Sequence, residues 1–142
     1  MTKTTEQKEL LNITGKVINY LDMWNISPKD IINILGLDIK PRHLPQYRKM
    51  EKALPDTKET FDRIDHIVGI ADALRTSYPF SEKMRISWLH KAHRRFAKKS
   101  PLSVILQEGI DGLMRVRIEV DCAYGWTISE TMHAAQQAKA RS

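Results

Sequence analysis

Histidines and acidic residues are the first candidates for metal binding in this sequence. His90 and His93 are three residues apart, which places both rings on one face of a helix, but the cations beside them oppose the binding of another cation. Asp62, Asp65 and His66 also lie close together, yet a carboxylate-bridged metal centre needs a second such helix, and the sequence offers none. We therefore predict no metal site and no cofactor.

Nucleophilic catalysis is also not indicated. The single cysteine, Cys122, has no base close to it in sequence, so a small buried side chain is the better interpretation. The sequence contains no glycine-rich loop that would cradle a phosphate. One cysteine cannot form an internal disulfide, the first residues lack the apolar core of a signal peptide, and no apolar run approaches a membrane span. We expect a cytoplasmic protein that is not an enzyme and has no membrane contact.

The chain carries a modest excess of positive charge. The chain of 142 residues has 23 Lys and Arg against 17 Asp and Glu, and a formal charge of +6 favours acidic partners such as nucleic acid. Residues 83–99 contain seven cations and no acid: Lys83, Arg85, Lys91, Arg94, Arg95, Lys98 and Lys99. Phe96 is interleaved with them, and Trp88 precedes most of them. Such a run is typical of a solvated face or of a surface that contacts an anionic partner.

A second group of hydrogen-bond donors follows a short predicted helix. Ser27 as N-cap, Pro28 at the first helical position and Gly36 as a stop predict a helix over 28–35. Together with the segment after Gly36, it has the outline of a helix-turn-helix DNA reader. The expected DNA contacts are Lys40, Arg42, His43, Gln46, Tyr47, Arg48 and Lys49. The alternative is an ordinary helical hairpin with a solvated basic face, which Pro41 and Pro45 favour.

The elements that position these residues are all predicted to be helices. Further start signals are a capping box at Asp56 and Glu59, Ser81, Ser100 before Pro101, and Asp111 after a stop at Gly109. Residues expected to face the core include Leu10, Ile13, Val17, Leu21 and Trp24; Phe61, Ile64, Ile67, Val68, Ala71 and Leu74; Met84, Trp88, Leu89 and Ala92; and Leu113, Val116, Val120 and Ala123. No strand pattern or repeat is present, so the fold class is all-α.

An ordered string of residues in the C-terminal half resembles a known family. The string comprises Trp88-Leu89, Ser100-Pro101-Leu102, Gly109, Gly112-Leu113, Val116, Asp121 and Tyr124-Gly125-Trp126. In order and spacing it is similar to antitoxins that have an Xre-like N-terminal part and an MbcA/ParS-type toxin-binding C-terminal part. The resemblance covers residues 17–126 and includes the linking segment LPDTKETFDRIDHIVGIADALRTSYP.

The resemblance implies a division of the chain. An Xre-like helix-turn-helix bundle would occupy 1–54, a long connecting helix 55–79, a small helical toxin-binding module 80–126 and a tail 127–142. The implied function is that of an antitoxin in a type II toxin-antitoxin system, which binds a RES-domain, NAD-consuming toxin directly and represses its own promoter. A stand-alone transcriptional regulator without a toxin is the alternative.

The resemblance also implies which residues meet the toxin. These are Trp88, Arg94, Arg95, Phe96, Pro101, Leu102, Tyr124, Gly125 and Trp126. The chain end would reach toward the toxin's active site, with Tyr124 and Trp126 as aromatic anchors, unless Trp126 folds back onto its own core. We expect a homodimer, because helix-turn-helix proteins usually bind DNA as symmetric pairs.

Overall fold

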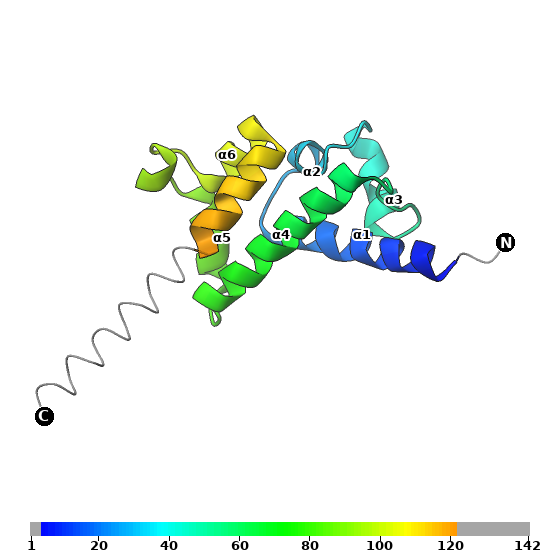
Figure 1. The fold of residues 1–142 in the computed structure, drawn as a ribbon, viewed down its shortest axis with the longest axis horizontal. Helices are drawn as coiled ribbons and strands as arrows, with labels where there is room; N and C mark the ends of the chain where they lie inside the picture. The colour runs from blue at the N-terminus through cyan, green and yellow to red at the C-terminus, as the bar shows by residue number, and fades with distance from the viewer. Residues whose placement is uncertain (1–3, 122–142) are drawn as a thin grey trace, which may run out of the picture.

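The computed structural model describes residues 4–121, and every regular element in this part of the chain is a helix (Figure 1). The α-helices are α1 (Thr5–Met23), α2 (Pro28–Leu35), α3 (Leu44–Arg48), α4 (Lys58–Ser77), α5 (Glu82–His90) and α6 (Pro101–Glu108). Two short 3-10 helices, η1 (Pro41–His43) and η2 (Arg94–Phe96), lie between them, and residues 110–121 are also helical. The all-α prediction is confirmed for these residues. The predictions for Cys122, Ala123, Tyr124, Gly125, Trp126 and the tail lie outside them.

Three helix starts follow the predicted capping residues. The side chains of Ser27, Ser81 and Ser100 each accept a hydrogen bond from the backbone N–H three residues later. Pro28 and Pro101 occupy the first turns of α2 and α6, where a missing N–H leaves no partner unsatisfied. These three helix starts confirm the sequence prediction.

Two predicted start signals are wrong. The N-cap of α4 is Thr57 rather than Asp56, because the Thr57 hydroxyl accepts the Thr60 N–H. Asp111 does not cap the last helix, since the helix already begins at residue 110 and the Leu113 N–H donates to the Gly109 carbonyl. Gly109 has a φ of +65°, so the chain turns there without a separate capping side chain.

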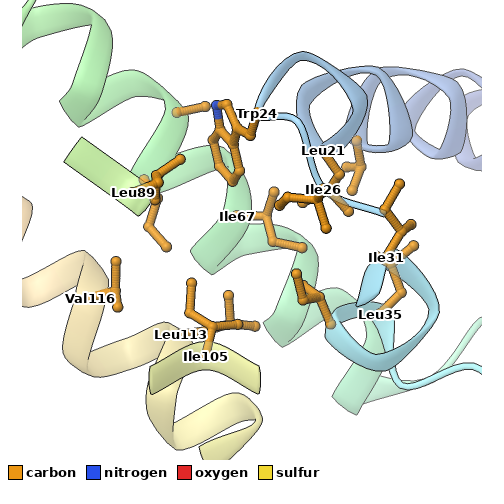
Figure 2. Packing of buried hydrophobic residues seen from close by; sticks show 14 of the residues in the cluster. Leu21, Trp24, Ile26, Ile31, Leu35, Ile67, Leu89, Ile105, Leu113 and Val116 are labelled. Atoms are coloured by element: carbon orange, nitrogen blue, oxygen red, sulfur yellow. The ribbon is translucent and has the colours of Figure 1, made fainter. Parts of the chain in front are cut away.

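A single hydrophobic cluster joins the two ends of the described chain. Figure 1 shows α4 through the middle of the molecule, with α1 and α3 toward one end and α5 and α6 toward the other. In Figure 2, Ile67 of α4 lies among Leu21 and Trp24 of the α1 end, Ile31 of α2 and Leu113 of the last helix. Helix α2 packs on both α4 and α6. The N-terminal and C-terminal parts therefore share one core.

Four residues expected in the core are exposed. Phe61, Met84, Ile13 and Ala92 all lie at the surface, with Phe61 41% exposed and Met84 53% exposed. Phe61 is in the first turn of α4, where it and Ile13 of α1 line an open cavity of about 400 Å³. Ala92 follows the end of α5 and so lies on no helix face. Hydrophobic periodicity predicts which face of a helix is apolar, but not which turns of that face are covered by neighbouring elements.

Candidate functional site

The predicted DNA-contacting segment is short and bent. Gly36 ends α2 in the left-handed conformation with a φ of +66°, and the chain then forms η1 and α3. Pro41 and Pro45 each lie in the first turn of their helix, which is the position that tolerates proline. With five residues, α3 is about 7.5 Å long. That is shorter than the roughly 12 Å width of a DNA major groove, so α3 alone offers little length for reading base pairs.

Part of the predicted donor set comes together around one hollow. A hollow of about 610 Å³ is lined by Asp38, Ile39, Lys40, His43, Gln46 and Lys52. Lys40, His43 and Gln46 belong to the predicted set, whereas Lys52 was missed because it follows the end of α3. Arg42 and Lys49 are exposed nearby in sequence but do not line this hollow. The Asp38 carboxylate opposes phosphate binding here, and the lysines favour it.

Two members of the predicted set have other roles. Tyr47 is only 5% exposed and belongs to the hydrophobic core, so its ring does not face a nucleic acid. Arg48 donates two hydrogen bonds to the Asp22 carboxylate of α1, from Nε at 2.8 Å and from Nη2 at 3.0 Å. These hydrogen bonds raise the pKa of the Arg48 guanidinium above its ordinary value. Because an acid already neutralises its charge, Arg48 is a weaker phosphate ligand than its exposed neighbours.

The basic run forms a closed loop, which we call the basic loop and define as residues 91–99. Helix α5 ends at His90, and the loop closes where the His93 N–H donates to the Lys99 carbonyl and the Lys98 N–H donates to the His93 carbonyl, both at 3.0 Å. Ala97 and Lys98 have positive φ angles of 53° and 66°, which turn the chain. No glycine or proline marks this turn in the sequence.

Aromatic side chains pack the basic loop against the core. The Trp88 ring lies 5.1 Å from the His93 ring and 6.3 Å from the Phe96 ring, centroid to centroid. Phe96 is only 3% exposed. The prediction that Phe96 contacts a partner is therefore not supported, because its side chain anchors the loop to the core. Trp88 is half-buried in the same group.

The histidines and acids that suggested metal binding serve as structural partners. His90 Nε2 lies 2.7 Å from the Trp24 carbonyl, and His93 Nε2 lies 2.8 Å from the Trp88 carbonyl. Asp65 accepts a hydrogen bond from Arg117 at 2.8 Å, which joins α4 to the last helix. Within residues 4–121, no three His, Cys, Asp or Glu side chains are arranged to hold a metal ion.

Within the string that carries the resemblance, the residues from Ser100 to Asp121 form a tight helical hairpin from α6 and the last helix. Pro101 is buried and Leu102 half-buried, and both lie in the first turn of α6. Gly112 approaches α6 so closely that an added Cβ would lie 2.5 Å from the Val104 carbonyl oxygen. On the outer face of the last helix, Met114 and Ile118 are 46% and 54% exposed and four residues apart. They form an apolar pair on one helix face.

No protein-family model, curated protein or solved structure matches the chain. The family resemblance seen in the sequence therefore stays a prediction. None of the helices in the described range 4–121 is long and apolar enough to cross a membrane.

Proposed function

We propose that this chain is a cytoplasmic antitoxin of a type II toxin-antitoxin system, which neutralises a RES-domain, NAD-consuming toxin by direct binding. The observation that carries the proposal is the exposed pair Met114 and Ile118 on the last helix. The same helix leads along the sequence to Tyr124 and Trp126, which the resemblance assigns to the toxin interface. An apolar helix face followed by two aromatic residues suits a binding surface with a few strong anchors.

The hairpin fixes the orientation of the helix face that carries Met114 and Ile118. Gly112 brings the last helix against α6, and Leu113, Val116 and Val120 bury the opposite side of the last helix in the core. A helix held in this way presents its outer face without losing much conformational freedom on binding. Inhibition then needs no chemistry from the antitoxin, only coverage of the toxin's active-site entrance.

The N-terminal part would supply repression of the promoter. Lys40, Arg42, Lys49 and Lys52 are exposed cations that can contact phosphates. Because α3 is short, we expect these contacts to position the protein and Gln46 and His43 to read bases at the groove edge. A homodimer, joined by apolar surface on α4, would place two copies of this segment on one operator.

The test is to look for a RES-domain gene beside the gene of this chain, to co-express the two proteins, and to measure growth and cellular NAD. Wild-type chain should preserve both. The variant carrying Met114→Asp and Ile118→Asp should fail to protect, because two charges would be buried unpaired at the interface. A matched control carrying Met23→Asp and Met50→Asp changes two exposed apolar residues outside the segment 80–126 and should protect fully. Full protection by the first variant would contradict the proposed interface.

A second candidate function is that of a stand-alone transcriptional regulator. The hollow lined by Lys40, His43, Gln46 and Lys52 favours it, because this hollow involves no residue of the proposed toxin interface. If no RES-domain gene adjoins this one and the protein nonetheless binds its own promoter more tightly than random duplex, this second candidate is the better account.

A further inference from the structure

We infer that the basic loop is a sequence-independent contact surface for the phosphate backbone of duplex DNA, separate from the segment 40–49. Residues 83–99 contain seven cations and no acid, which exceeds the formal charge of +6 of the whole chain. The remainder of the protein is therefore close to neutral overall. The net charge that would attract nucleic acid is concentrated in and beside this loop.

Most of the loop's cations are not neutralised within the protein. Among residues 4–121, no carboxylate lies within ion-pair distance of Lys91, Arg94, Lys98 or Lys99. Lys99 Nζ donates to the neutral Gln107 amide oxygen at 3.0 Å, so its charge remains. The acids nearby are already engaged. Glu119 pairs with Arg95 at 3.0 Å and Glu108 pairs with Arg115, whose guanidinium lies over the Phe96 ring.

The loop is organised before any partner binds. Its two closing hydrogen bonds join His93 to Lys98 and Lys99, and the rings of Trp88 and Phe96 fix it to the core. Cations on a fixed loop lose less conformational freedom on binding than cations on a flexible tail. Such an arrangement suits repeated contact with regularly spaced phosphates.

The chemistry of the exposed side chains favours nucleic acid over a protein partner. The interface cores of protein complexes are rich in aromatic residues and depleted of lysine. Here the arrangement is the reverse, because the aromatic residues point inward and Lys91, Arg94 and Lys98 point outward. Exposed cations without apolar anchors are typical of backbone contacts, which give affinity but no sequence preference.

The position of the loop makes it a distinct surface. Figure 1 shows η2, drawn in yellow-green, at the end of the molecule opposite α3 and its cyan surroundings. The inference does not depend on the proposed toxin. The basic loop contains neither the proposed promoter contacts nor the exposed pair Met114 and Ile118. The family resemblance assigned Arg94 to the toxin, and the experiment below distinguishes the two roles.

The experiment measures the affinity of the full chain for a random-sequence DNA duplex at salt concentrations between about 50 and 200 mM. The loop variant carries Lys91→Gln, Arg94→Gln and Lys98→Gln. If each cation neutralises one phosphate, the slope of log affinity against log salt should become shallower by about 2.7. A control variant with Lys8→Gln, Lys16→Gln and Lys29→Gln removes the same charge from exposed positions outside the loop and should leave the slope nearly unchanged.

A charge-preserving variant and the melting temperatures of all variants separate an effect of charge from an effect on folding. The charge-preserving variant with Lys91→Arg, Arg94→Lys and Lys98→Arg should keep the wild-type slope, and all variants should keep the wild-type melting temperature because Trp88, His93 and Phe96 are unchanged. A wild-type slope in the loop variant, or no duplex binding by the wild-type chain, would overturn the inference. So would loss of toxin inhibition in the loop variant without any change in duplex binding, because the loop would then be a protein contact. Failure of the toxin experiment alone leaves this inference standing.

Discussion

Gly112 is the residue at which a single methyl group should damage the fold most specifically. An alanine Cβ at this position would lie 2.5 Å from the Val104 carbonyl oxygen, 2.9 Å from the Ile105 Cα and 3.0 Å from the Val104 carbonyl carbon. All three are backbone atoms of α6, which cannot rotate away as a side-chain end can. The hairpin between α6 and the last helix would have to open to admit the methyl group.

The size of the effect follows from two opposing terms. Overpacking of this kind costs about 1–3 kcal/mol, whereas alanine in place of glycine in a helix recovers up to about 1 kcal/mol. Because Gly112 lies in the first turn of the last helix, we expect the recovered part to be small. Gly112→Ala should therefore lower the free energy of unfolding by about 1–2 kcal/mol and the melting temperature by about 4 °C for each kcal/mol.

Thermal and urea unfolding followed by circular dichroism would measure this, with Gly15→Ala as the matched control. At Gly15 an added Cβ would meet Met50 Cγ at 2.8 Å and Sδ at 2.9 Å, but Met50 is a flexible, exposed side chain that can move away. The control should be neutral or up to about 1 kcal/mol more stable than wild type. If Gly112→Ala proved as stable as wild type, the last helix would not pack on α6 as closely as described.

Three further predictions concern single side chains. Thr14→Val should lower the free energy of unfolding by about 1–3 kcal/mol, because the buried Thr14 hydroxyl accepts a hydrogen bond from the Leu54 backbone N–H at 3.0 Å. Thr14→Ser keeps the hydroxyl and should retain most of the wild-type stability; urea unfolding measures both variants. Arg48→Gln should change the salt slope of duplex binding less than Lys49→Gln does, since an acid already neutralises Arg48; equal changes would speak against this. Tyr124→Ala and Trp126→Ala should each weaken toxin binding by about 2 kcal/mol or more in calorimetry, with an unchanged melting temperature.

Local features of this fold could be predicted from the sequence, and contacts between distant segments could not. The caps at Ser27, Ser81 and Ser100 were predictable because each cap hydrogen bond spans three residues. The hydrogen bond from His90 to the Trp24 carbonyl joins residues 66 positions apart, and no local pattern indicates it. The exposure of Phe61 has the same origin, because it depends on what packs beside the first turn of α4.

The candidate sites also combine features that the sequence could predict with features that it could not. The concentration of charge in 83–99 was visible in the sequence, as was the grouping of Lys40, His43 and Gln46. The burial of Tyr47 and Phe96 was not, because an aromatic residue among cations suits a nucleic-acid contact as well as a core position. The left-handed turn at Ala97 and Lys98 carried no sequence signal, since neither residue type favours it.

The packing of α2 on α6 has a consequence for synthesis on the ribosome. Ile31 and Leu35 are buried in the same cluster as Val104 and Ile105 of α6, which are translated about 70 residues later. At about 5–20 residues per second, α2 waits about 4–14 s for the segment that completes its burial. During that interval, the part of the apolar face of α2 that α6 covers is accessible to chaperones and proteases. A chain whose translation stops before α6 would therefore also leave part of the core around α2 uncovered.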